Sequence, residues 1–209
     1  MPHGELVGHI LATSCTVLLG FALSVVSIPL AVAITSSEFV SKTIYPILMV
    51  TQSIPKVALA PILIVLLGAG ELPRTLVTFL VAFFPLVVST VSGLLATSAE
   101  LIELGKSYKA GQFKMFWRIR LPFAVPFIFS GLKVASSLSV VGAVVAEFVA
   151  ANRGLGYLIT TSVAFFEPGV AWGAVLILAV MGIAFFGAVD VVERVCFPWS
   201  DSRQTGDRK

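Results

Sequence analysis

The chain has 209 residues, 57% of them hydrophobic and only 12% charged, with a formal net charge of +3. Soluble domains are typically about 25% charged, so this chain has too few ionic groups for a water-facing surface, and its composition excludes an ordinary soluble domain. The basic residues stand in short segments between apolar runs. This arrangement argues against nucleic-acid binding and indicates loops that flank membrane spans.

Five apolar runs are long enough to cross a bilayer, which takes about 20 helical residues. They are 9–34, 43–68, 75–97, 121–146 and 170–192. Each is expected to be helical because unpaired backbone polar groups are too costly in hydrocarbon, and none alternates as a barrel strand would. The sequence therefore predicts an all-α integral membrane protein of about five transmembrane helices, with a single domain over 1–198 and a polar tail over 199–209.

The distribution of Lys and Arg predicts how the spans are oriented. Ten of the 14 basic residues fall on one side of a five-span topology, whereas only Arg74 and Arg153 fall on the other. Cytoplasmic loops of membrane proteins are enriched in Lys and Arg, so the 98–121 loop, the tail and the C-terminus are expected in the cytoplasm. The N-terminus is then expected outside.

The long loop between the third and fourth spans mixes charged and aromatic residues. Phe113, Phe116 and Trp117 are spaced i, i+3, i+4, which places them on one helical face, with Lys114 and Arg118 beside them. Three interpretations stay open at this stage: a helix on the membrane surface, a helix docked into a groove of a soluble partner, and a solvated connector.

Gly105-Lys106-Ser107 looks like the end of a phosphate-binding loop, but the match is incomplete. The first glycine of G-x-x-x-x-G-K-[ST] would fall on Glu100, whose carboxylate would repel a phosphate, and no strand precedes it. We therefore expect no nucleotide site and no bound cofactor in this chain. If ATP drives its function, a partner polypeptide binds the ATP and Mg.

The same loop resembles the EAA loop of the permease subunits of binding-protein-dependent ABC importers, whose pattern is E-A-A, a glycine, and then I-x-L-P. The positions that match this pattern are Glu103, Ile119, Leu121 and Pro122. Leu104 and Gly105 replace the two alanines. Lys109 replaces the glycine, and Gly111 follows two residues later. The spacing of the motif is kept even where its residues differ.

Two further segments extend the resemblance to nearly the whole chain. They are 52–61, QSIPKVALAP, and 142–158, GAVVAEFVAANRGLGYL, and both are similar to the subfamily that imports nitrate, sulfonates, taurine and thiamine-precursor pyrimidines. Members of that group usually have one more N-terminal helix. The resemblance therefore also implies that the start of this chain is shortened.

The resemblance implies the permease core of a type I-like ABC importer in a bacterial inner membrane. Two copies would pair around a pathway in the lipid bilayer, two cytoplasmic ATPases would each receive one loop, and a periplasmic or surface-tethered binding protein would deliver the substrate. The substrate would be a small anion or heterocycle of the nitrate, sulfonate, taurine or thiamine-precursor type. The chain would not be an enzyme. Its Glu103 to Gly111 segment, with Lys106, would be the docking helix.

Polar side chains inside the spans or at their ends are candidates for the pathway or its gate, because burying them in a bilayer is costly. They are Gln52, Lys56, Ser136, Ser137 and Glu147. Lys56 either attracts an anion, pairs internally or snorkels, and the serines either line a pathway or hydrogen-bond between helices. Glu147 either acts in gating or holds the outer segment through Arg153 or the backbone. Lys133 is expected to form a structural pair.

Other function classes receive less support. The main alternative, an ATP-independent secondary transporter or channel, would predict an inverted repeat or a charged relay, and neither is seen. An intramembrane enzyme would need a motif such as H-E-x-x-H or G-x-S-x-G, and His3 and His9 stand near the terminus. We therefore predict no catalytic residue. We also predict no metal site, since Cys15 and Cys196 have no partner spacing.

Overall fold

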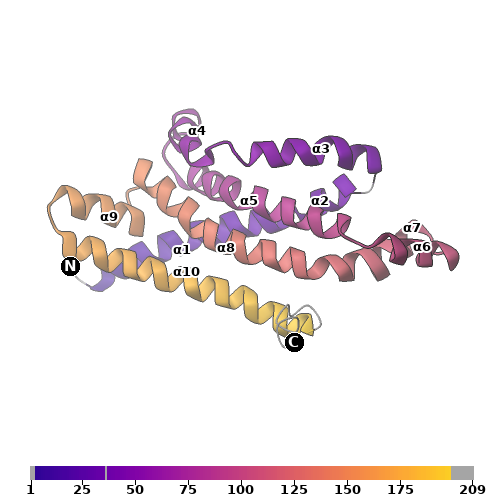
Figure 1. The fold of residues 1–209 in the computed structure, drawn as a ribbon. Coiled ribbons are helices and arrows are strands. Elements are labelled where there is room, and N and C mark those ends of the chain that lie inside the picture. The colour runs from indigo at the N-terminus through magenta and orange to yellow at the C-terminus, as the bar shows by residue number, and fades with distance from the viewer. Residues whose placement is uncertain (1–2, 36, 199–209) are drawn as a thin grey trace.

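The computed structural model describes residues 3–35 and 37–198, and this part of the chain is helical without strands (Figure 1). Its elements are α1 (His3–Val26), α2 (Ile28–Thr35), α3 (Glu38–Thr51), η1 (Lys56–Leu59), α4 (Ala60–Leu67), α5 (Glu71–Leu95), α6 (Ala99–Ser107), α7 (Gln112–Met115), η2 (Phe116–Arg120), α8 (Leu121–Ala150), α9 (Leu155–Ala164) and α10 (Pro168–Cys196). The predicted polar tail, 199–209, lies outside the described residues.

Within residues 3–35 and 37–198, four helical stretches are long and apolar enough to cross a membrane, and a bent pair gives a fifth when it is counted as one span. The four are Glu5–Thr35, Glu71–Leu95, Gln112–Val149 and Pro168–Cys196. The bent pair is Phe39–Thr51 with Lys56–Leu67, whose axes differ by 77°. The predicted all-α membrane class is confirmed, with each of the five expected runs represented.

The second predicted span is not one straight helix, because Pro55 interrupts it. Proline has no backbone N–H and disfavours helical geometry in the residue before it. The chain leaves α3 through two tight turns, in which Ser53 N donates to Val50 O at 3.0 Å and Ile54 N donates to Thr51 O at 3.2 Å. The span resumes as η1 after Pro55, so the break follows from a proline that the sequence displays.

The centre of the bundle is the pair α5 and α8, which lie side by side along most of their length (Figure 1). Glycines let the two backbones approach closely, which is the usual basis of helix packing in lipid. A Cβ at Gly142 would lie 2.9 Å from the Thr78 Cα, and one at Gly131 would lie 2.8 Å from the Ser89 Cβ. Gly93 lies in the same way against Phe127. The two helices therefore form a tightly packed unit.

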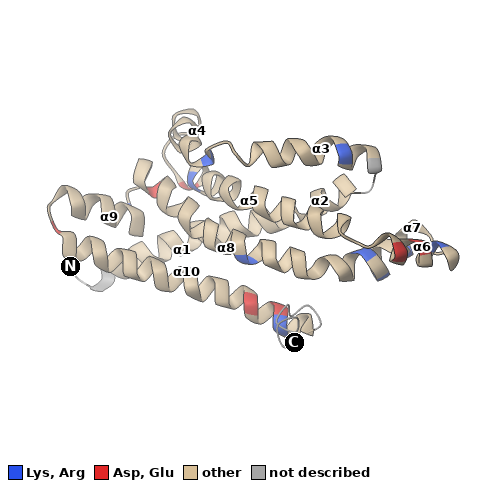
Figure 2. Ribbon diagram, in the orientation of Figure 1, with Lys and Arg blue, Asp and Glu red and all other residues tan. Residues whose placement is uncertain are grey.

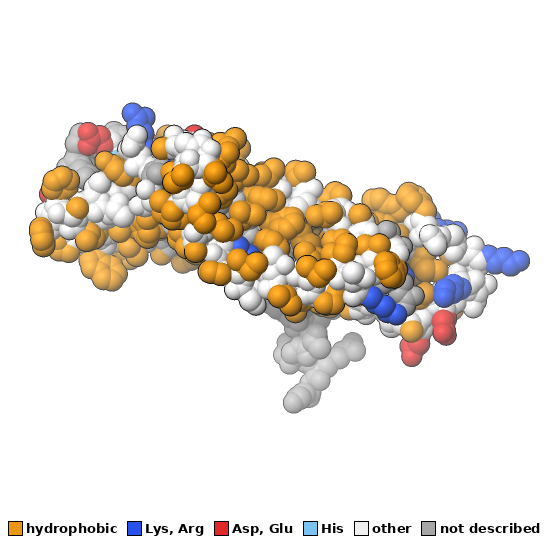
Figure 3. Space-filling model, turned by 90° about the horizontal axis from the view of Figure 1, so that it is seen from above, with side chains coloured by type: hydrophobic (Ala, Val, Ile, Leu, Met, Phe, Trp, Pro, Cys, Tyr) orange, Lys and Arg blue, Asp and Glu red, His pale blue; other side chains and the backbone are white. Residues whose placement is uncertain are grey.

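The outside of the bundle is apolar along its middle and charged toward its ends. Figure 3 shows hydrophobic side chains covering most of the face seen from above, and Figure 2 shows few charged residues along the central helices. Large apolar side chains such as Val65, Leu66 and Ile183 are more than two-thirds exposed. An apolar exposed surface of this extent fits contact with lipid rather than water.

Candidate functional site

The two ends of the bundle differ, and the candidate site lies at the end that carries α6 and α7, here called the loop end (Figure 1). The opposite end, which carries α9, is called the α9 end. At the loop end, α6 begins after Ser98, with Glu100 in its first turn and Lys106 in its last. This placement of an acid and a base matches the helix dipole.

Helix α6 ends in a Schellman motif centred on Lys109. Ala110 N donates to Gly105 O at 3.0 Å, and Lys109 N donates to Lys106 O at 2.8 Å. Lys109 has a φ of +51°, the left-handed conformation that glycine adopts most easily at this position. Lys109 stands where the EAA pattern has a glycine, and this is the position at which the backbone turns. The turn therefore forms here with a lysine in place of the glycine.

Gly105, the buried residue of α6, fixes the helix to the base of α8. A Cβ on Gly105 would lie 2.9 Å from Ile119 Cδ1 and 3.3 Å from Met115 Cε. The alanine position of the resemblance and the first residue of its I-x-L-P therefore touch each other. This contact gives a physical reason for their fixed spacing along the chain.

The segment that joins α7 to α8 is a π-helix, η2, with Leu121 and Pro122 opening α8. The three aromatics that were expected on one face are neighbours, since the Trp117 ring centre lies 6.0 Å from that of Phe113 and 5.7 Å from that of Phe116. Phe116 packs against the buried cluster around Leu94, whereas Phe113 and Trp117 are exposed. The expected docking helix from Glu103 to Gly111 is displaced along the chain from α6, which begins at Ala99 and ends at Ser107, before the Lys109 turn.

The outward side of α6 is exposed and mixes charged with apolar groups. Leu101, Leu104 and Tyr108 are exposed at helical spacing, and Glu103 and Lys106 are exposed beside them. A shallow hollow of about 210 Å³ lies beside the contact of Gly105 with Ile119, with Leu104, Tyr108, Lys114 and Arg118 among its lining residues. Lys109 and Gly111 are exposed too, while Ile119, Leu121 and Pro122 are half-buried. The predicted loop residues thus divide into an exposed set and a packed set.

At the bend of the second span, Lys56 is held by its own segment. Its Nζ donates to Gln52 O at 2.8 Å and lies 4.6 Å from the centre of the Phe84 ring. The side chain of Gln52 reaches Met49 Sδ, at 3.8 Å. Internal pairing is therefore the interpretation of Lys56 that this geometry favours, although the ammonium group stays partly exposed.

The serines of α8 bond within their own helix rather than between helices. Ser136 and Ser137 donate to Lys133 O at 2.8 and 3.4 Å. The Lys133 ammonium group forms ion pairs with Asp190 and Glu193 of α10, at 2.6 Å each. This geometry is the structural pair expected of Lys133, and it ties α8 to α10.

Glu147 lies at the α9 end and is only 1% exposed. Its carboxylate accepts hydrogen bonds from Thr13 Oγ1 at 2.8 Å and from Gly156 N at 2.8 Å. Thr13 Oγ1 in turn accepts from Leu155 N at 2.8 Å. The carboxylate thus holds the first turn of α9, where the helix dipole favours negative charge. Arg153 and the backbone were the two partners expected for Glu147 in the outer segment, and the structure shows the backbone.

Two residues of this α9-end cluster were missed by sequence reasoning. Thr13 belongs to the first span, and His9 Nδ1 accepts a hydrogen bond from Gly154 N at 3.0 Å. Nothing in the spacing of the chain connects residues 134 positions apart, as Thr13 and Glu147 are. The glycine at position 154 was a signal of a turn before α9, and in the structure it has a φ of +128°. Among the described residues, no group of three or more His, Cys, Asp or Glu could hold a metal.

Comparisons with known proteins place this arrangement in context. A sequence model described as "Binding-protein-dependent transport system inner membrane component" matches residues 23–196. The formylaminopyrimidine transport permease protein ThiX of Halalkalibacterium halodurans is 36% identical over 193 residues, which cover 91% of this chain and 77% of ThiX. The riboflavin transport system permease protein RibX of Chloroflexus aurantiacus is 32% identical, with 79% of this chain and 62% of RibX covered. The taurine transport system permease protein TauC of Escherichia coli is 26% identical, with 91% of this chain and 70% of TauC covered.

Proposed function

The chain belongs to the family of inner-membrane components of binding-protein-dependent transport systems, and from this premise we propose that it is the force-receiving permease subunit of an ATP-driven importer. It is a multi-pass inner-membrane protein and a transport permease component. In the proposed cycle, α6 docks on a separate cytoplasmic ATPase, which binds the ATP and Mg. The loop end then faces the cytoplasm, and the α9 end faces outward.

The contact of Gly105 with Ile119 is the observation that carries this proposal. It packs an exposed helix directly against η2, at the base of α8. α8 packs along α5 through the glycines described above, so a displacement of α6 would move the central pair of helices rather than the loop alone. An exposed surface that is rigidly joined to the core is what mechanical coupling requires.

The remaining partners follow from the family rather than from contacts in this chain. We propose that two copies pair around the pathway and that a substrate-binding protein delivers its cargo to the α9 end. The substrate is proposed to be a small heterocycle or organic anion. This substrate class is supported by the names of three relatives, which refer to formylaminopyrimidine, riboflavin and taurine.

Uptake by the reconstituted complex tests the proposal. Vesicles that contain the permease, its ATPase and its binding protein are loaded with ATP, and uptake is compared with ATP hydrolysis. We expect Glu103→Arg and Lys106→Glu to lower uptake about tenfold or more, while the protein stays folded and hydrolysis continues. Charge reversals on a docked face introduce repulsion worth several kcal/mol.

Glu5→Arg is the matched control, because it reverses an exposed acid outside the proposed docking surface. It should leave the ratio of uptake to hydrolysis unchanged. Normal uptake by both α6 variants at normal protein levels would refute the docking role. Full uptake without any ATPase would favour a secondary transporter instead.

A further inference from the structure

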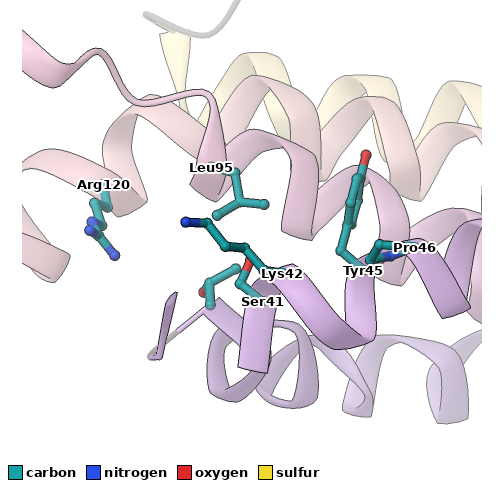
Figure 4. A pocket seen from close by; sticks show the side chains of 7 residues that line it. Ser41, Lys42, Tyr45, Pro46, Leu95 and Arg120 are labelled. Carbon is teal, nitrogen blue, oxygen red and sulfur yellow. The ribbon is translucent and has the colours of Figure 1, made fainter. Parts of the chain in front are cut away.

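A second feature of the loop end takes no part in the proposed coupling: an open cavity of about 680 Å³ between α2, α3, the end of α5 and η2 (Figure 4). Thr35, Ser41, Lys42, Tyr45, Leu95 and Arg120 are among its lining residues. Its volume is within the range of small-molecule sites, about 300–1,000 Å³. The cavity is therefore large enough for a headgroup-sized ligand.

The polar lining of the cavity is suited to an anion. Figure 4 shows the Lys42 side chain extending from α3 toward the side from which Arg120 approaches. The Arg120 Nε is buried and has no hydrogen-bond partner, and a buried donor of this kind favours a ligand that can accept from it. The guanidinium fork matches phosphate oxygens. No acidic residue is among the lining residues within the described ranges.

The two cations are not equivalent. Lys42 already interacts with another group of the protein. The Arg120 Nε, in contrast, is buried without a hydrogen-bond partner. Arg120 is therefore the stronger attractor for a ligand, and Lys42 is the weaker one.

An apolar track continues from the cavity along α3. Pro46 and Met49 follow Lys42 at helical spacing on the same side, and both are exposed. Ile47 and Val50 beside them are also exposed. A free anion has no apolar surface to bury against this track, whereas the acyl chains of a phospholipid can pack against it. The combination favours a ligand with an anionic head and an apolar body.

We propose that this cavity binds the phosphate headgroup of an anionic phospholipid, with its acyl chains along the exposed side of α3. The lipid would bridge α3 to η2, at the base of α8. Apart from such a ligand, α3 is tied to the core by the Tyr45–Ser92 hydrogen bond, at 3.0 Å, and by a small apolar cluster. The proposal requires the chain to lie in a membrane but does not require ATPase coupling, so the two can fail separately.

Native mass spectrometry of the full-length protein, purified in detergent with the subunits that remain on it, tests this site. Phosphatidylglycerol and phosphatidylcholine of identical acyl chains are titrated in turn. We expect phosphatidylglycerol to bind at least about fivefold more tightly. Arg120→Gln should weaken it about fivefold and Lys42→Gln less, because each basic group contributes modestly at an anionic membrane surface.

Arg153→Gln is the control, because it removes one exposed positive charge from the α9 end. It should leave phosphatidylglycerol binding unchanged. Arg120→Lys keeps the charge but loses the Nε donor and the fork, so its affinity for phosphatidylglycerol should lie between those of Arg120→Gln and the unaltered protein, which separates loss of charge from misfolding. A monodisperse peak in size-exclusion chromatography is required of every variant.

Three results would overturn the proposal. The first is equal binding of the two lipids. The second is unchanged phosphatidylglycerol binding in a folded double variant, Lys42→Gln with Arg120→Gln. The third is displacement of the lipid by millimolar inorganic phosphate, which would assign the cavity to a free anion. Binding of phosphatidylglycerol that inorganic phosphate does not displace, and that the double variant loses, would support a lipid site.

Discussion

The two ends of this bundle use their polar residues in opposite ways. At the α9 end, the buried Glu147 carboxylate accepts from Thr13 and Gly156, and Gly154 N donates to His9. At the loop end, α6 exposes Glu103 and Lys106 and is fixed to the core by the packing of Gly105. The polar cluster of the α9 end is buried and hydrogen-bonded within itself, whereas the charged side chains of α6 are exposed.

This difference indicates that the polar cluster of the α9 end contributes to stability, whereas the charged side chains of α6 are available to a partner. Buried polar groups that are fully hydrogen-bonded specify one arrangement and are costly to disturb. Exposed charges near an apolar surface contribute little to folding by themselves. Substitutions at the α9 end should therefore affect folding first, and those on the outward side of α6 should affect transport first.

The largest expected effect comes from Glu147→Ala, which would break the closed network. The change leaves the Gly156 amide and the Thr13 hydroxyl without their acceptor, so we expect a loss of about 3 kcal/mol in stability. Thermal unfolding in detergent measures this loss. Thiol labelling of Leu158→Cys, at a position that is buried when α9 is docked, reports whether α9 has moved away.

The matched control for this change is Glu103→Ala, since that carboxylate is exposed at the loop end. It should change stability by less than about 0.5 kcal/mol, as is usual for surface positions. Equal unfolding temperatures for the Glu147 and Glu103 variants would contradict the comparison between the two ends.

The next largest effect is expected from Gly105→Leu, which would separate α6 from the base of α8. The added side chain cannot fit against Ile119 and Met115, and overpacking of this kind costs about 1–3 kcal/mol locally. We expect the spans to stay folded while uptake falls and ATP hydrolysis continues. Gly105→Ala is the control, because its Cβ meets the movable end of Ile119. Full uptake by Gly105→Leu would argue against transmission through this contact.

The smallest effect is expected from Lys109→Gly, which would sharpen the comparison by stabilising the loop end. Glycine tolerates the left-handed conformation better than lysine does, so the end of α6 should gain about 0.5–1 kcal/mol. Hydrogen exchange of the Lys109 and Ala110 amides should slow down. Lys106→Gly, at a helical position, should have the opposite effect. Faster exchange in Lys109→Gly would show that the turn is not strained.

The sequence was sufficient for features that depend on local chemistry, and insufficient for those that depend on distant contacts. Apolar length predicted all five runs, and Pro55 explains the bend that turned the second run into a broken span. α9 was missed because its ten residues are too short to register as a span. The Thr13–Glu147 bond joins residues far apart in sequence, which no periodicity reveals.

The coupling loop shows the same division within a single segment. Its spacing could be read from Glu103, Ile119 and Pro122, but the contact that explains the spacing involves the bare backbone of Gly105. The spacing of Phe113, Phe116 and Trp117 correctly predicted neighbouring rings. The π-helix over 116–120 was not predicted, because a helical projection assumes a constant period.

A crosslinking measurement tests the central claim most directly. A photoreactive amino acid is placed at Leu104, on the exposed surface of α6, or at Val163, exposed at the α9 end, and cells that express the transporter are irradiated. The account predicts that the residue at 104 captures a cytoplasmic ATPase subunit and that the residue at 163 does not. Capture of the ATPase from 163, or its absence from 104 in an actively transporting strain, would contradict the assignment of α6 as the point where force enters.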